Sequence, residues 1–274
     1  MNETIAIVGG GNLGRALARG LSASGAVDRG SIVITRRSEA GLQALRDEGF
    51  TATNDNGSAA SQASLIVVAV RPKQLNRVLD ELKNVLIPDR HVLVSTVSDA
   101  SIEHIEQHIG GSVPVVRAMP NIGVAVGASM TCLAATATAS QDAKRRVEEL
   151  FEPLGLVQFI EEGQMTPATA LCACGVAFFL RAIRAASQGG VQVGFHADEA
   201  IRLAAQTAKG AAELVLASDR HPETLIDSVT TPLGVTIAGL NEMEHQGFGS
   251  ALIRGIVLSA ERARGLYDKE ASGE

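Results

Sequence analysis

The sequence predicts an α/β protein with a doubly wound, mostly parallel sheet of the Rossmann type, followed by an all-helical domain. Short β-branched runs alternate with Ala-rich helical stretches through the first 160 residues. Several runs, such as Leu65–Val70, are apolar on both faces, as parallel strands covered by helices on each side are. After about residue 163 the strand patterns nearly vanish. We therefore expect a Rossmann domain over residues 1–162 and a helical domain over residues 163–274.

Seven strands and five helices are expected in the first domain. The strands follow the β-branched runs Thr4–Val8, Ser31–Thr35, Leu65–Val70, His91–Thr96, Val113–Arg117, Met130–Ala134 and Leu156–Ile160. The helices lie near residues 13–23, 38–48, 73–85, 100–108 and 140–152. Ser38 and Ser101 each stand before an acidic first turn, so each is expected to cap the helix that follows it.

The second domain is expected to contain only helices, near residues 164–188, 196–217, 222–229, 235–245 and 248–266. In the last of these, Leu252, Ile256 and Ala260 recur every four residues and form an apolar stripe. A domain of about 100 residues with such small side chains buries little apolar surface alone. We therefore expect it to pair with a second copy, as a homodimer or a larger homo-oligomer.

The composition excludes several classes of function. Aromatic residues make up only 3% of the 274 residues and Trp is absent, which disfavours sites that stack bases or sugars. The net charge of −6 disfavours nucleic acid as a partner. Three Cys cannot form a disulfide framework, the N-terminus lacks signal-peptide features, and no apolar run approaches about 20 residues. We expect a cytoplasmic protein with no membrane partner.

A glycine-rich loop follows the first strand. It reads Gly9-Gly10-Gly11-Asn12-Leu13-Gly14 and opens a helix, so it matches G-x-G-x-x-G in the context that the motif requires. The first glycine permits the tight turn, the second lets a pyrophosphate approach the backbone, and the third lets the helix pack close to the strand. We predict a dinucleotide site here; the alternative is a glycine-rich turn that only packs.

The end of the second strand indicates which dinucleotide binds. An NAD site usually has Asp or Glu there to bind the ribose 2′-hydroxyl, whereas this chain reads Thr35-Arg36-Arg37-Ser38. Two guanidinium groups and a hydroxyl at a helix start suit a 2′-phosphate. NADPH is therefore favoured over NADH as the cofactor. The alternative is a solvated basic turn.

Other polar features follow later strands. Val70-Arg71-Pro72 ends a strand at the sheet edge where α/β proteins bind ligands, and Asn121 follows another strand beside a Pro turn. Asn121 suits contact with a substrate or with the nicotinamide amide, and equally suits a turn. His104 and His108 have metal-ligand spacing, but with no third ligand in sight we interpret them as a solvated helix face and predict no metal. We interpret Cys172-Ala173-Cys174, which lacks C-x-x-C spacing, as small core residues.

Taken together, the motifs resemble one family over nearly the whole chain. They are GGGNLG, AVRP, RAMPN and a dense C-terminal pattern comprising Gln206-Thr207, Gly210-Ala211, His221-Pro222, Asp227, Val229, Thr236-Ile237 and Gly247-Phe248. This set resembles the pyrroline-5-carboxylate reductase family. The resemblance implies a Rossmann domain, a helical domain that intertwines with a second subunit, and NAD(P)H that delivers hydride to a cyclic C=N bond.

The resemblance also implies roles for individual residues. By resemblance, the nucleotide site would use Gly9, Gly11, Asn12, Leu13, Arg36, Arg37, Asn56, Val70, Arg71 and Pro72. The substrate carboxylate would be bound by the loop from Thr230 to Thr236, which includes Thr231, Leu233, Gly234 and Val235. Thr236 matches the family threonine near the imine nitrogen, and Asn121 and Val176 lie in segments that line the family's cleft.

Four segments depart from the family pattern. The family usually reads MPNTP where this chain has Ile122-Gly123 after Asn121, SGSGPAY where it has Cys172 to Phe178, and SPGGTT where it has Thr231 to Thr236. The family's Ala-Gly is here Val97-Ser98. These changes remove small hydroxyls and glycines and add aliphatic bulk. Leu233 is the most consequential change, because a glycine lets the backbone reach a carboxylate.

The prediction for function is therefore NADPH-dependent reduction of 1-pyrroline-5-carboxylate to proline. One alternative is a paralogue that reduces another or bulkier cyclic imine, in a pocket shaped by Ile122, Val176, Leu233 and Val235. A second is a catalytically silent homologue that binds nucleotide or partner proteins. The loops that match the family's substrate-binding segments, such as Thr230 to Thr236, contain no Asp, Glu or His. We therefore infer no dedicated general acid and expect Thr236 to hydrogen-bond the ring nitrogen.

Overall fold

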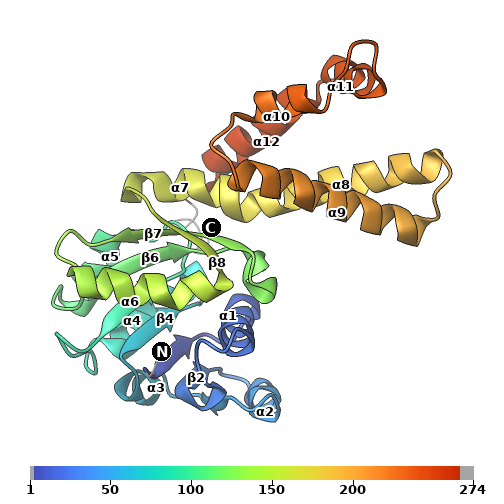
Figure 1. Cartoon of the computed structure of the whole chain (residues 1–274). Helices are drawn as coiled ribbons and strands as arrows, with labels where there is room; N and C mark the ends of the chain where they lie inside the picture. Colours follow the sequence, from blue (N-terminus) through green and yellow to red (C-terminus); the bar gives the residue numbers. More distant parts are fainter. Residues whose placement is uncertain (1–2, 266–274) are drawn as a thin grey trace. The chain divides into compact units, whose positions relative to one another are not determined.

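The computed structural model describes residues 3–265. In this part of the chain one sheet contains eight strands, drawn from blue to green in Figure 1. The strands are β1 (Ile5–Val8), β2 (Ile32–Thr35), β3 (Thr51–Thr53), β4 (Leu65–Val68), β5 (Val92–Ser95), β6 (Val115–Met119), β7 (Ser129–Ala135) and β8 (Gly155–Phe159). Their order is β3-β2-β1-β4-β5-β6-β7-β8. The first six are parallel in the Rossmann order, and β7 and β8 run opposite to them.

Helices cover both faces of this sheet. They are α1 (Asn12–Ala23), α2 (Glu39–Asp47), α3 (Asn56–Gln62), α4 (Leu75–Leu82), α5 (Ile102–Ile109) and α6 (Gln141–Phe151). Because side chains alternate along a strand, β1 contributes to both cores. Ile5 and Ile7 pack with α1, α2 and α6, whereas Ala6 and Val8 pack with α3, α4 and α5. The fully apolar strands are thus explained by burial on both sides.

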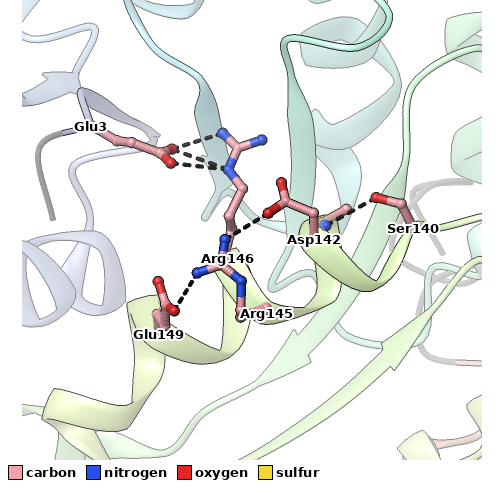
Figure 2. A network of polar contacts seen from close by, with 7 residues as sticks. Glu3, Ser140, Asp142, Arg145, Arg146 and Glu149 are labelled. Atoms are coloured by element: carbon pink, nitrogen blue, oxygen red, sulfur yellow. Dashed lines mark hydrogen bonds and ion pairs between the residues drawn. The ribbon is translucent and has the colours of Figure 1, made fainter.

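Charged side chains attach α6 to the start of β1. Arg146 on α6 forms an ion pair with Glu3, whose oxygens lie 2.7 and 3.1 Å from its guanidinium nitrogens (Figure 2). Arg145, on the same helix, bridges Asp142 and Glu149. The Ser140 hydroxyl accepts a hydrogen bond from the Ala143 backbone N–H and caps the helix. These contacts place α6 over the sheet face that carries Ile5 and Ile7.

All seven predicted strands and all five predicted helices of the first domain are confirmed, with ends shifted by up to three residues. The short elements β3 and α3 were not predicted. Ser101 caps α5 through the His104 N–H as expected. The expected Ser38 cap is wrong: the Ser38 hydroxyl makes no capping bond and instead accepts from Arg36 Nε at 3.4 Å. The strand predicted to reach Val70 ends at Val68, and Pro72–Gln74 forms a 3₁₀ turn.

Cys174–Leu258 forms a second compact unit, and the first unit contains residues 3–173 and 259–265 of the described chain. The domain boundary expected after residue 162 stays a prediction. The expected helix over residues 164–188 has three parts: α7 (Met165–Ala168), a π-helical turn (Thr169–Cys174) and α8 (Gly175–Gln192). The other expected helices are confirmed as α9 (Ala197–Leu216), α10 (Pro222–Ser228), α11 (Val235–His245) and α12 (Phe248–Ala263).

The second unit buries little of its own surface. Its helices α8 and α9 pack along each other (Figure 1), and a Cβ on Gly190 would lie 3.1 Å from the Ala200 Cβ. Within Cys174–Leu258, only Gly175, Ser187 and Ala200 are fully buried. Many large apolar side chains of this unit are exposed, among them Phe179, Leu180, Leu203, Leu214, Leu216, Val229, Ile253 and Leu258. Exposed apolar surface of this extent marks an interaction face.

Among residues 3–265, one helical run, Glu162–Gln192, is long and apolar enough to cross a membrane by length and composition alone. Its most apolar window has a mean hydropathy of 1.6. A helix that a second subunit covers meets the same criterion, so this single run is weak evidence for a membrane span.

Candidate active site

A cavity of about 760 Å³ lies at the carboxyl ends of β1, β2, β4 and β5. It is located where the strand order reverses between β1 and β4, which is where doubly wound sheets bind ligands. Ten residues predicted to bind the nucleotide line it: Gly9, Gly11, Asn12, Leu13, Arg36, Arg37, Ser38, Asn56, Val70 and Arg71. Gly14 and Pro72, also predicted, do not line the cavity but are sequence neighbours of residues that do.

The three motif glycines satisfy three different geometric demands. Gly9 has φ +113°, and a Cβ there would lie 2.4 Å from the Ala69 carbonyl oxygen. A Cβ on Gly14 would lie 2.2 Å from the Gly9 carbonyl oxygen, so only glycine lets α1 start this close to the loop. A Cβ on Gly11 would meet nothing within 4 Å, so the backbone there faces open space. This combination is what a phosphate-binding loop requires.

Thr35, at the end of β2, holds the loop in place. Its hydroxyl accepts a hydrogen bond from the Gly9 N–H at 3.1 Å, and its carbonyl accepts one from the Gly10 N–H at 2.7 Å. Thr35 is buried and lines the cavity. Sequence reasoning missed this role, although a hydroxyl residue at the strand end directly before the arginine pair was a readable signal.

Cationic side chains surround the cavity beside this loop. The Arg36 guanidinium donates to the Gly10 carbonyl, which fixes it against the loop. Arg37 and Arg71 are exposed. Farther along the wall, Asn56 Nδ2 donates to Glu81 at 2.6 Å, and Glu81 also pairs with Arg77 at 3.2 Å. Arg77 and Glu81 line the cavity as well and were not predicted.

These residues fit a dinucleotide that carries a 2′-phosphate. The open backbone at Gly11 leaves space for a pyrophosphate at the start of α1. The cavity wall at the end of β2 carries Arg36, Arg37 and Ser38 where an NAD site has a carboxylate. Two cations there match the extra charge of the 2′-phosphate.

The predicted substrate loop lies in the second unit, between α10 and α11. The Gly234 N–H donates to the Thr231 carbonyl at 2.9 Å, which closes a tight turn. Leu233 adopts φ +58°, a left-handed conformation that favours glycine, and its side chain is fully exposed. A Cβ on Gly234 would lie 2.5 Å from the Thr231 hydroxyl oxygen. The turn therefore requires a glycine at position 234, and position 233 carries a leucine in a strained conformation.

The turn leads directly into α11. Val235 and Thr236 stand in its first turn and are exposed. Thr230, at the other end of the loop, donates its hydroxyl to the Asp227 carbonyl at 3.1 Å. The first N–H groups of a helix lack intrahelical partners and attract anions. The loop therefore offers backbone N–H donors at the start of α11 beside the exposed side chain of Thr236. Val176 lies in the first turn of α8, half-buried.

Asn121 uses its polar atoms within the first unit. Its Oδ1 accepts from the Gly123 N–H at 2.8 Å, and its Nδ2 donates to the Cys172 carbonyl at 3.1 Å. This is the turn role that the sequence left open, and substrate contact by Asn121 stays a prediction. His104 Nε2 contacts Asn76 Oδ1 at 2.8 Å. Across residues 3–265, no group of three or more His, Cys, Asp or Glu side chains is arranged to hold a metal.

Two relatives from Dictyostelium discoideum establish the family. The chain is 48% identical to its pyrroline-5-carboxylate reductase 1 over 97% of the present chain, which spans half of that longer protein. It is 46% identical to pyrroline-5-carboxylate reductase 2, covering 96% of this chain and 92% of the relative. The chain belongs to the pyrroline-5-carboxylate reductase family.

Family models and solved structures agree with this membership. Residues 162–266 match the pyrroline-5-carboxylate reductase dimerisation model, and residues 4–99 match a model described as coenzyme F420-dependent NADP oxidoreductase. A pyrroline-5-carboxylate reductase from Coxiella burnetii is 30% identical with a TM-score of 0.88, covering 97% of this chain and 99% of its own. The Plasmodium falciparum pyrroline carboxylate reductase, solved with NADP bound, is 25% identical with a TM-score of 0.86, covering 96% and 98%.

Proposed function

We propose that this member of the pyrroline-5-carboxylate reductase family reduces 1-pyrroline-5-carboxylate to proline with NADPH. The observation that carries the proposal is the cavity at the β1/β4 switch point, where the Gly9–Gly14 loop and the arginine pair lie together. Support also comes from the 46% identity to a Dictyostelium reductase that aligns over almost its whole length.

NADPH, when bound, supplies the hydride that the imine carbon receives. In this proposal the N–H groups at the start of α1 bind the pyrophosphate in the open space beside Gly11, and Arg36, Arg37 and Ser38 bind the 2′-phosphate. The remaining lining residues Asn12, Leu13, Asn56, Val70 and Arg71 hold the rest of the dinucleotide. Thr35 positions the loop by accepting from the Gly9 N–H. NADH lacks the group that the arginine pair binds and is the weaker cofactor.

The loop from Thr230 to Thr236 binds the substrate carboxylate through its hydroxyls and the free N–H groups at the start of α11. Anions are favoured there because the helix terminus carries unpaired donors. The Thr236 hydroxyl hydrogen-bonds the ring nitrogen as it becomes an amine. The iminium forms in solution, so the chain's task is to position the substrate and exclude water.

Leu233 favours a second candidate, the reduction of another or bulkier cyclic imine. A leucine in a left-handed conformation on this turn adds bulk where the family usually has glycine. The distinguishing experiment measures NADPH oxidation with pyrroline-5-carboxylate, with a piperideine carboxylate and with 1-pyrroline, which lacks the carboxylate. The proposal predicts the highest kcat/KM for pyrroline-5-carboxylate. Turnover of only the other two imines favours the second candidate, and binding of NADPH with no turnover indicates a silent homologue.

We also propose that the helical unit forms a homodimer or a larger homo-oligomer in the cytoplasm. The match of residues 162–266 to a dimerisation model supports this, as does the apolar surface that this unit exposes. A partner subunit then covers the exposed apolar side chains of α8, such as Phe179 and Leu180, instead of lipid. Light scattering in detergent-free buffer at micromolar concentration tests this: a monomeric mass contradicts it.

A further inference from the structure

We propose that Cys132 and Cys172 form a redox site at which hydrogen peroxide converts two thiols into an intramolecular disulfide. Their sulfur atoms lie 3.9 Å apart, although the residues are 40 positions apart in the chain. Both belong to the first compact unit. Cys174, the third cysteine, takes no part in the contact, so the pairing is specific.

The surroundings of the two thiols give them different tasks. Cys132 lies on β7, is 5% exposed, and packs among Met119, Ala134 and Met165. Cys172 lies in the π-helical turn Thr169–Cys174 and is half-buried. A small oxidant from solvent therefore reaches Cys172 first. Cys132 is shielded from solvent, but its sulfur lies close enough to react with the Cys172 sulfur once Cys172 is oxidised.

The electrostatics agree with this division. Hydrogen bonding from Cys132 lowers the pKa of Cys172 to about 7, against the opposing effect of burial. Hydrogen bonding to Cys172 raises the pKa of Cys132 well above its ordinary range, and burial adds to the increase. Since the thiolate is the reactive form, Cys172 is the attacking sulfur and Cys132 the resolving thiol near neutral pH.

The chemistry balances with peroxide as the oxidant. The Cys172 thiolate attacks one peroxide oxygen, the O–O bond breaks, and hydroxide leaves, which gives a sulfenic acid. The Cys132 sulfur then attacks the Cys172 sulfur, the S–S bond forms, and the S–OH bond breaks. The departing hydroxide takes the Cys132 thiol proton and leaves as water. Overall two thiols lose two electrons and two protons, and one peroxide becomes two waters.

The disulfide also changes a contact in the Asn121 turn. A disulfide needs its sulfur atoms about 2.05 Å apart, so one or both cysteines must move by roughly 2 Å in total. The π-helical turn is the element that can move, since Cys132 is fixed within the sheet. The Cys172 carbonyl accepts from Asn121 Nδ2 at 3.1 Å, so its displacement disturbs the Asn121–Gly123 turn. On the proposed function, this lowers reductase activity reversibly.

The test treats the full-length protein with stoichiometric hydrogen peroxide and compares it with Cys174→Ala, Cys132→Ala and Cys172→Ser. In the wild type and Cys174→Ala we expect a mass loss of about 2 Da, a fall from three free thiols to one in the wild type, and a Cys132–Cys172 peptide in a non-reducing digest. Cys132→Ala should instead stop at a sulfenic acid on Cys172 that dimedone captures. If Cys132→Ala does not fold, Cys172→Ser, which should form no link, decides the same point.

A link that includes Cys174, or sulfinic acid at Cys172 without any link, overturns the proposal. Activity is read separately, before and after peroxide and after dithiothreitol. Lost activity that dithiothreitol restores supports the coupling to Asn121, and a linked protein with full activity overturns it. Absence of turnover in the untreated, reduced protein refutes only the proposed function, because the mass measurement still decides whether the dithiol is a redox site.

Discussion

The Thr35 hydroxyl accepts a hydrogen bond from the Gly9 N–H at 3.1 Å, which ties the end of β2 to the first glycine of the phosphate loop. Gly9 has φ +113°, a backbone conformation that L side chains rarely adopt. A side chain 26 positions away therefore helps set the shape of the loop on which NADPH binding is proposed to depend.

Replacing Thr35 with Val removes this acceptor while keeping the side-chain volume. The Gly9 N–H then lacks its partner, at a cost of about 1 kcal/mol, so the Kd for NADPH should rise about fivefold. Thr35→Ser retains the hydroxyl and should bind NADPH within about twofold of the wild type. Titration calorimetry measures both variants. Wild-type affinity in Thr35→Val would contradict the role assigned to the hydroxyl, and equal weakening in Thr35→Ser would show that the hydrogen bond alone does not set the affinity.

Arg37→Ala tests the basis of the cofactor preference. Arg37 lines the cavity and is exposed, unlike Arg36, which is already bonded to the loop. Loss of a charge-assisted contact to the 2′-phosphate should raise the Kd for NADPH about tenfold and leave that for NADH unchanged. Lys73→Ala, an equal charge change just outside the cavity wall, is the matched control. A parallel loss for both cofactors contradicts the assignment.

Thr236→Ala tests the contact proposed for the ring nitrogen. If the hydroxyl bonds the nitrogen as it becomes an amine, kcat should fall about tenfold or more while KM changes little. Thr236→Ser should retain most of the activity because it keeps the hydroxyl. Steady-state kinetics with pyrroline-5-carboxylate decide between these outcomes, and an unchanged kcat in Thr236→Ala removes the residue from the reaction.

Leu233→Gly relieves a strained conformation and removes an exposed side chain. Glycine adopts φ near +58° without steric cost, so the free energy of unfolding should rise by about 1 kcal/mol. Direct backbone approach to the carboxylate should also lower KM for pyrroline-5-carboxylate. Leu233→Ala removes the bulk but keeps the strain, so it separates the two effects. A KM that rises in both variants would mean that Leu233 contacts the substrate favourably.

The Glu48 carboxylate connects α2 to α1 and makes stability depend on pH. Hydrogen bonds from Arg19 and Arg15 lower the pKa of Glu48 to about 2, with burial opposing them. A depressed folded-state pKa contributes stability above the unfolded value near 4.5, and this contribution disappears as pH falls toward 2. Glu48→Gln should therefore cost about 1 kcal/mol at pH 7, and progressively less below pH 4.5.

Denaturant unfolding across pH 3–7 checks this, with Glu39→Gln as the control. Glu39 is exposed, lies at the start of α2 and forms an ion pair with Arg46 at 3.1 Å. Exposed pairs contribute little, so its substitution should change stability by less than about 0.5 kcal/mol at any pH. A Glu48→Gln penalty that stays constant with pH would assign the effect to packing.

The sequence was most informative where a pattern is local. Apolar runs located the long strands, and G-x-G-x-x-G followed by Arg36-Arg37 located residues that share the cavity wall. The β3 strand, Thr51–Thr53, was missed because three residues show no alternation, and α3 because its buried face consists only of Ala59 and Ala60. Neither carries a periodic signal strong enough to be read.

Long-range contacts left no trace in the sequence. Cys132 and Cys172 lie close together only because β7 and the π-helical turn pack against each other. Sequence analysis considered only the neighbouring pair Cys172 and Cys174, and interpreted it as small core residues. The Ser38 cap was mispredicted because the Arg36 side chain occupies its hydroxyl. Leu233 was identified by its departure from the family pattern, and the structure supplies the physical reason: the position requires a positive φ.

The most direct test of the central claim follows the transferred hydrogen. The chain is incubated with pyrroline-5-carboxylate and NADPH that carries deuterium at both C4 positions of the nicotinamide, and the product is analysed by mass spectrometry and NMR. We predict proline that carries one deuterium at its δ carbon, in amounts equal to the NADPH consumed. Consumption of NADPH without labelled proline, or no consumption with this substrate while another cyclic imine is reduced, would contradict the proposed reaction.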